Sequence, residues 1–188
     1  MSFPKNVFIL LGNGFSIDLM KTIGKSEEVN LSNLFASGAE VPWPETDTPG
    51  FLSFQNCPNL WTLGARPYLD KEKTLEIIEE VITCANILPQ RTQIKDKIYI
   101  RAYNELEQYL MSLFVYYTTK VDISRQKSKL NAWGWTKYLK SLYSDINVKS
   151  VSIVSLNYDV WLEKLLDIFS IPYSIDGFSE TKEKIHIY

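Results

Sequence analysis

Histidine and cysteine are scarce in this chain. One histidine, His186, occurs among 188 residues, so catalysis anywhere else in the chain must proceed without imidazole. The two cysteines, Cys57 and Cys84, lie far apart and form no C-x-x-C pair. This spacing argues against a disulfide framework and against a structural zinc site, and it fits a reducing cytoplasm. We expect both cysteines to be small buried hydrophobic residues, and we expect no bound metal.

The chain also lacks a block of like charge and a long apolar run. The net charge is −2, and lysine and arginine are dispersed among the acidic residues, so no basic stripe indicates nucleic acid as a partner. The apolar run from Val7 to Leu11 is too short for a signal peptide or a membrane span. We therefore expect a cytoplasmic protein that binds neither a membrane nor a nucleic acid.

The composition that is present is that of an ordinary globular protein. Hydrophobic residues make up 45% of the chain and charged residues 22%, which disfavours disorder and coiled coil. A length of 188 residues is enough to bury a sizeable core. We predict a single domain over residues 1–188, with an irregular and helical insertion at 24–145.

Two strand-to-helix junctions lie near the ends of the chain. The run Val7 to Leu11 predicts a strand buried on both faces of a parallel sheet, followed by a helix from Phe15 to about Ile23 that Ser16 is placed to cap. Residues 148–156 predict a second strand, which leads into a helix near 161–169. Short strands are expected at 171–175 and 184–188. The order predicts an α/β fold with a Rossmann-like parallel sheet and flanking helices.

The region between the junctions is first irregular and then helical. Residues 24–70 hold most of the prolines and glycines, and we expect four of their aromatic residues to pack against the protein. These four are Trp43, Phe51, Phe54 and Trp61. Helical spacing then predicts helices over 75–85, 99–117 and 127–143, with their apolar and aromatic stripes in the core.

Each junction has a structural and a functional interpretation. At the first, Gly12 and Gly14 permit left-handed backbone angles and the close approach of a diphosphate, or they make only a tight turn. The full dinucleotide fingerprint requires a third glycine where Ile17 stands, which disfavours an ordinary Rossmann dehydrogenase. At the second, Asp159 caps a helix and Asn157 holds the turn, or the two bind ribose hydroxyls, an amide or a water.

Taken together, the two junctions resemble the sirtuin-like (silent-information-regulator-like) NAD-binding family, and in particular its bacterial branch of antiphage and abortive-infection proteins. That family shows an apolar strand with G-[AN]-G-F-S and later T-x-N-Y-D followed by leucine and glutamate. Ser155 replaces the usual threonine. The matching residues are Gly12, Asn13, Gly14, Phe15 and Ser16 in the first motif, and Asn157, Tyr158, Asp159, Leu162 and Glu163 in the second.

The resemblance implies a role for each part of the motifs. The first motif, Gly12 to Ser16, would bind the NAD diphosphate. Asn157 would lie by the nicotinamide ribose and hold the attacking water or a ribose hydroxyl, and Asp159 would fix the nicotinamide end. The implied reaction is cleavage of the nicotinamide–ribose bond with water as the acceptor. Deacetylation fits less well, because classical sirtuins carry a module with four zinc-binding cysteines.

The chain departs from the family at the catalytic histidine. The family has K-L-H-G after the N-Y-D helix, whereas this chain has Lys184-Ile185-His186-Ile187. His186 is the catalytic base of a variant motif, or it is an ordinary strand histidine and the chain is the N-terminal part of a longer protein. We favour the second of these.

Three functions follow from the sequence. The first is hydrolysis of NAD by a defence effector, acting as a homo-oligomer or with a phage or defence protein. The second is a non-catalytic sensor of NAD or ADP-ribose that gates a partner. The third is a protein-interaction module whose junctions are purely structural.

Overall fold

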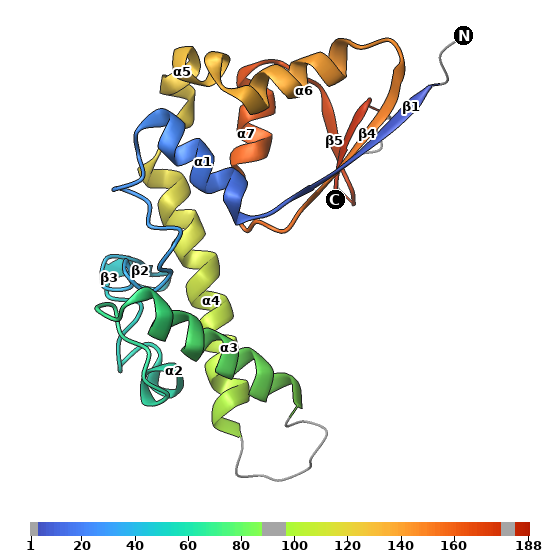
Figure 1. Cartoon of the computed structure of the whole chain (residues 1–188). Helices are drawn as coiled ribbons and strands as arrows, with labels where there is room; N and C mark the ends of the chain where they lie inside the picture. The colour runs from blue at the N-terminus through green and yellow to red at the C-terminus, as the bar shows by residue number, and fades with distance from the viewer. Residues whose placement is uncertain (1–3, 88–96, 178–182) are drawn as a thin grey trace. The chain divides into compact units, whose positions relative to one another are not determined.

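The computed structural model describes residues 4–87, 97–177 and 183–188 (Figure 1). The chain divides into two compact units, one formed by Met1–Val29 with Lys120–Tyr188 and the other by Asn30–Thr119. The second unit covers the middle of the insertion predicted at 24–145, whereas residues 120–145 belong to the first unit.

The first unit is built on a four-stranded sheet in which each paired strand is parallel to its neighbour. The order across the sheet is β1 (Lys5–Leu11), β4 (Val148–Ser155), β6 (Ile185–Ile187) and β5 (Tyr173–Ile175). All four strands were predicted from the sequence. The structure thus confirms an α/β fold with a parallel sheet and flanking helices, an arrangement consistent with a Rossmann-like fold.

The helices of this unit lie on the same side of the sheet in Figure 1. They are α1 (Asn13–Ile23), α5 (Lys127–Ala132), α6 (Gly134–Ser144) and α7 (Trp161–Ile168), with the 3₁₀ helix η3 (Ile123–Gln126) before α5. Helix α1 ends where Gly24 adopts a left-handed φ of 76° and the next amide, of Lys25, bonds back to the Met20 carbonyl. Glycine takes this conformation without strain, so Gly24 fixes the end of the helix.

The single helix predicted over 127–143 is wrong, because the chain breaks between α5 and α6. Trp133 stands at the break with an extended ψ of 141°. Its side chain is buried, with its ring centroid 5.3 Å from that of Phe15, and its Nε1 donates a hydrogen bond to Asp18. Contacts with α1 therefore determine where the helix is interrupted, and a local helical periodicity cannot report them.

The prediction that β1 is buried on both faces is also wrong. Ile9 and Leu11 are buried, at 8% and 3% exposure, whereas Phe8 and Leu10 are 70% and 62% exposed. Side chains alternate between the two faces of a strand, so one face of β1 packs into the core and the other is open. The covered face of the sheet continues through Val151 and Ile153 of β4 and through Ile185 and Ile187 of β6.

The second unit contains α2 (Pro58–Thr62), α3 (Lys71–Ile87), most of α4 (Lys97–Lys120) and a short hairpin of β2 (Pro42–Trp43) and β3 (Thr48–Pro49). Helices α3 and α4 confirm the two helices predicted at 75–85 and 99–117. The predicted core role of the α4 stripe holds for Leu106, Leu113 and Tyr117, which are buried. The predicted α3 stripe is wrong in part, because Leu75 and Ile82 are 41% and 40% exposed.

The irregular part of this unit packs around α4. The Tyr109 hydroxyl donates to the Leu34 carbonyl at 2.6 Å, and Glu105 accepts from the Leu60 amide at 2.7 Å. Phe51 is buried beside Tyr109, as expected of the aromatic residues here, but Phe54 is 64% exposed. Polar groups of α4 thus replace the hydrogen bonds that regular secondary structure would supply.

The cysteines follow the prediction in part. Cys57 is fully buried, and burial raises the pKa of its thiol to about 12, so the thiol is protonated at neutral pH. Cys84 is only half-buried on α3.

The two faces of β1 give the first test of the fold. We expect Ile9→Ala to lower the free energy of unfolding by about 2–4 kcal/mol, because it empties a buried site. The neighbouring change Phe8→Thr should alter it by less than about 0.5 kcal/mol, because the ring lies in solvent. Urea unfolding of both variants measures the contrast, and a comparable loss in each would contradict the open face.

Candidate functional site

The structure brings the two predicted junctions together. Leu11, the last residue of β1, pairs with Ser155, the last residue of β4, and the Leu156 amide extends the pairing by bonding to the Leu11 carbonyl at 2.9 Å. The loops that follow, leading into α1 and α7, therefore start at the same carboxyl edge of the parallel sheet. Open α/β sheets bind their ligands at this edge.

Three of the predicted site residues form one hydrogen-bonded group, which we call the polar triad: Ser16, Asn157 and Asp159. The Ser16 hydroxyl donates to Asp159 Oδ2 at 2.6 Å, and Asn157 Nδ2 donates to Ser16 Oγ at 3.0 Å. Ser16 is fully buried, Asp159 is 8% exposed and Asn157 is half-buried. The triad thus joins the two sequence motifs through side chains 141 to 143 positions apart.

These contacts change the structural roles expected of the three residues. Ser16 does not cap α1, because the helix begins at Asn13 and its N-cap is Gly12. Asn157 does not hold its own turn through its side chain, which bonds across to Ser16. Asp159 is not the N-cap of α7 either, because the N-cap is Val160, but its Oδ1 accepts from the Trp161 amide at 3.2 Å at the start of that helix. The other carboxylate oxygen of Asp159, Oδ2, accepts the hydrogen bond from Ser16 in the polar triad.

The acidic groups here are partly desolvated. Burial raises the pKa of the Asp159 carboxyl, while the bonds from Ser16 and the Trp161 amide act in the opposite direction. Burial also raises the pKa of Glu163, one helical turn further, and the charges of Asp159 and Asp167 add to that effect. Two carboxyl groups therefore share a region of low polarity where negative charge is costly.

The glycines of the first junction are needed neither by the backbone nor by packing. Gly12 has an extended φ of −128°, and neither Gly12 nor Gly14 adopts the left-handed angles that glycine permits. A Cβ built on either glycine would meet nothing within 4 Å. Asn13 is exposed beside them, and the first-turn amides of α1 lie at the same edge. This surface offers open backbone and the positive end of a helix dipole.

His186 lies elsewhere on the sheet. It pairs in register with Ser152 of β4, three residues before the strand ends, which places it about 10 Å along the sheet from the junctions. Its Nδ1 is 2.7 Å from the Ser174 hydroxyl of β5. The structure therefore does not bring His186 to the polar triad, and its catalytic role stays a prediction.

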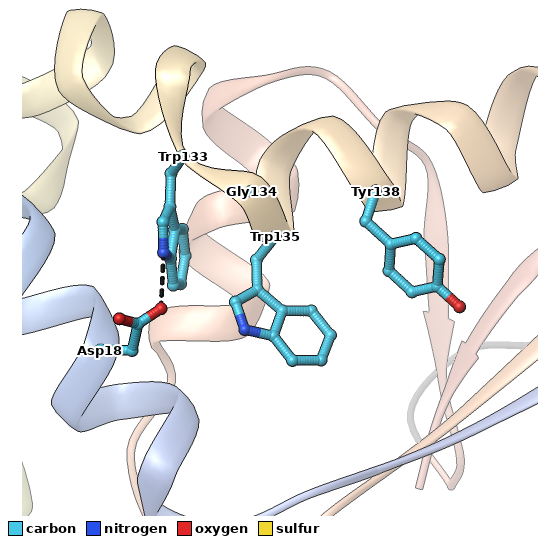
Figure 2. Close-up of a pocket in the computed structure, with 5 residues that line it drawn as sticks. All are labelled: Asp18, Trp133, Gly134, Trp135 and Tyr138. Carbon is cyan, nitrogen blue, oxygen red and sulfur yellow. Dashed lines mark hydrogen bonds between the residues drawn. The ribbon is translucent and has the colours of Figure 1, made fainter.

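A pocket of about 390 Å³, which local sequence patterns did not predict, lies beside α1 and α6 (Figure 2). Asp18 of α1 lines one side, and Trp133, Gly134, Trp135 and Tyr138 line the other. Phe15, predicted to bind a cofactor, is buried behind this pocket, with its ring 5.3 Å from Trp133 and 5.5 Å from Trp135. The Trp-Gly-Trp sequence was the available signal, but it falls in a segment assigned to a helix core.

Comparisons of the chain with protein-family models, with curated proteins and with solved structures give no match. The family resemblance therefore rests on the two motifs. Within the described ranges 4–87, 97–177 and 183–188, no helix is long and apolar enough to cross a membrane. Over the same ranges, no cluster of three or more histidine, cysteine or acidic side chains could hold a metal ion.

The raised pKa of Asp159 predicts a pH dependence of stability. The carboxyl is harder to ionise in the folded chain, so its contribution to stability is complete below its ordinary pKa of 3.8 and is lost as pH rises through the folded-state pKa. We compare the free energy of unfolding of the native protein with that of the Asp159→Asn variant. The native value minus the variant value should fall as pH rises above about 4. Urea unfolding over a pH series measures it.

Asp145 supplies a control of opposite sign. Hydrogen bonds from Asn147 lower the pKa of Asp145, so the same difference for Asp145→Asn should rise with pH over the acidic range. A flat or rising difference for Asp159→Asn would contradict the desolvation of Asp159.

Proposed function

We propose that this chain is a sirtuin-like NAD-binding domain of the bacterial antiphage branch and that it hydrolyses NAD at the nicotinamide–ribose bond. One observation carries the proposal: the polar triad unites Ser16 of the first motif with Asn157 and Asp159 of the second. Motifs that were matched separately in the sequence thus meet in one buried group at the ligand-binding edge of a parallel sheet.

The glycines of the first junction support binding of a diphosphate. Neither Gly12 nor Gly14 is required by φ or by packing, and both lie beside the N-terminus of α1. A phosphate accepts hydrogen bonds from first-turn amides and is favoured by the helix dipole, and a side chain at these positions would occupy its path. Binding of a ligand therefore explains glycines that the fold itself does not need.

The polar triad supports chemistry on a ribose. Asn157 gives Nδ2 to Ser16, and its Oδ1 has no hydrogen-bond partner within the described part of the chain, so this oxygen can accept from a water or a ribose hydroxyl. Ser16 and the Trp161 amide fix the carboxylate of Asp159. A water held in this way is already in position to react, so the reaction does not depend on its chance arrival from solvent.

The proposed reaction breaks the bond between ribose C1′ and the nicotinamide nitrogen. The bonding electrons go to the pyridinium ring, which leaves as neutral nicotinamide, and the ribose becomes an oxocarbenium-like cation. Water adds to C1′ and loses a proton, so the products are ADP-ribose, nicotinamide and a proton. A cationic transition state is stabilised by nearby negative charge, which the Asp159 carboxyl supplies when it is ionised.

A second candidate, binding of NAD or ADP-ribose without turnover, is favoured by one observation. His186, the only histidine, lies away from the polar triad and is bonded to Ser174. Saturable binding of NAD without release of nicotinamide would support this sensor function. A ligand that binds only the folded state raises its melting temperature, so failure of NAD to do so would favour the interaction module instead.

Asn157→Ala tests the hydrolase. We expect release of nicotinamide from NAD to fall at least about 100-fold, the scale on which a positioning group contributes, with the melting temperature little changed. Asn131→Ala, on an exposed part of α5, is the matched control and should retain full release. Equal turnover in the Asn157 and Asn131 variants would contradict the proposed role of Asn157.

Gly14→Ala separates a binding site from a structural turn. Alanine favours a helix over glycine, and its methyl group would stand in open space, so the ligand-free protein should gain about 0.5–1 kcal/mol of stability. The dissociation constant for NAD should rise at least about tenfold if the backbone of this turn contacts the diphosphate. Calorimetric titration and urea unfolding measure the two effects, and a stabilised variant with unchanged affinity would show that NAD does not bind at Gly14.

A further inference from the structure

The aromatic pocket between α1 and α6 is a separate site from the polar triad. Asp18 and Ser16 are two residues apart on α1, and side chains at this spacing point in different directions from a helix. Ser16 is buried in the triad, whereas Asp18 is exposed and faces the pocket. The inference drawn here therefore does not depend on binding of NAD.

The walls of this pocket are aromatic rings, and Phe15 packs against one of them. Figure 2 shows Trp135 and Tyr138 side by side on α6, with Trp133 and the Asp18 carboxylate next to them. The ring centroids of Trp135 and Tyr138 are 6.0 Å apart at an interplanar angle of 74°, and Phe15 packs edge-on to Trp135. Tyr138 is 43% exposed, so the pocket opens to solvent beside this residue.

The polar wall of the pocket is the Asp18 carboxylate, which forms no ion pair with any residue in the described ranges. Trp133 Nε1 donates to Asp18 Oδ2 at 2.8 Å, which orients the carboxylate, while Oδ1 has no hydrogen-bond partner among the residues described. Lys21 lies one turn further along α1, yet no ion pair with Asp18 occurs in the described ranges. The carboxylate is thus fixed beside the rings with its charge unpaired.

The sign of the local field follows from two opposing contributions. Helix α6 begins at Gly134, and the N-terminus of a helix carries about half a positive charge. The Asp18 carboxylate carries a full negative charge, and the faces of the two indoles and the phenol add negative potential. A cation is therefore preferred over an anion, and a flat one over a compact ammonium because the walls are rings.

We propose that this pocket binds a flat organic cation of the pyridinium type, held by the faces of Trp133, Trp135 and Tyr138 and by the charge of Asp18. A volume of about 390 Å³ has room for a six-membered ring with small substituents. The indole N–H of Trp133 fixes the carboxylate in place, so little ordering is needed when the cation enters.

The test titrates the protein with N-methylpyridinium and follows the indole N–H signals of its five tryptophans by NMR. Signals of Trp133 and Trp135, identified from Trp→Phe variants, should shift saturably, while those of Trp43 and Trp61 in the second unit should not. Benzyl alcohol, a neutral ring of similar size, should bind at least about tenfold more weakly, because it lacks both the cation–π attraction and the attraction to Asp18.

Two pairs of variants test whether binding needs the charge of Asp18 and the ring of Tyr138, and they distinguish these effects from a loss of folding. Asp18→Asn retains an acceptor for Trp133 but removes the charge and should weaken binding at least about fourfold, whereas Glu76→Gln on exposed α3 should leave it unchanged. Tyr138→Leu should weaken binding and Tyr138→Phe should preserve it, because only the second retains the ring. Tyr138 is partly exposed, so both variants should fold, which their melting temperatures will check.

Three results would overturn the inference: no saturable shift of Trp133 and Trp135, equal affinity for benzyl alcohol and N-methylpyridinium, or unchanged affinity in Asp18→Asn. The second and third would show an apolar cleft that does not select charge.

Discussion

The hydrogen bond between Ser16 and Asp159 is the contact on which the first unit depends. It joins the start of α1 to the loop before α7 at 2.6 Å, and both residues are buried. Losing either partner would leave the other buried and unsatisfied, which costs more than the bond itself contributes. Parallel pairing aligns the ends of β1 and β4, and this bond then fixes the geometry of both loops that leave the sheet.

The fold was largely predictable from local patterns, and the candidate site in part. Apolar runs located the strands, and helical spacing located α3 and α4. The motifs identified Ser16, Asn157 and Asp159 as site residues, but their partners were assigned within each loop, whereas Ser16 and Asn157 bond to each other across the sheet edge. Spacing reports neighbours along the chain, and these partners are neighbours only after the sheet has formed.

The errors have a common physical origin. The open face of β1 depends on where the helices pack, and the helix break at Trp133 depends on Phe15 and Asp18 more than 100 positions away. The aromatic pocket arises from the same break, since it lets Trp133 and Trp135 both meet α1. Long-range contacts thus account for what local periodicity could not predict, namely the ends of elements and the surfaces between them.

The division into two units has a consequence for the order of folding during synthesis. The second unit is continuous, from Asn30 to Thr119, whereas the first needs β1 to pair with β4, which begins at Val148. On a ribosome, the apolar strand β1 emerges first, but its partner is translated only after the whole second unit is available. Non-local parallel pairing is slow, and exposed strands are prone to aggregate. The second unit can therefore fold while β1 waits for β4, so the first segment of the sheet to be made stays unpaired until residues 148–155 have been made.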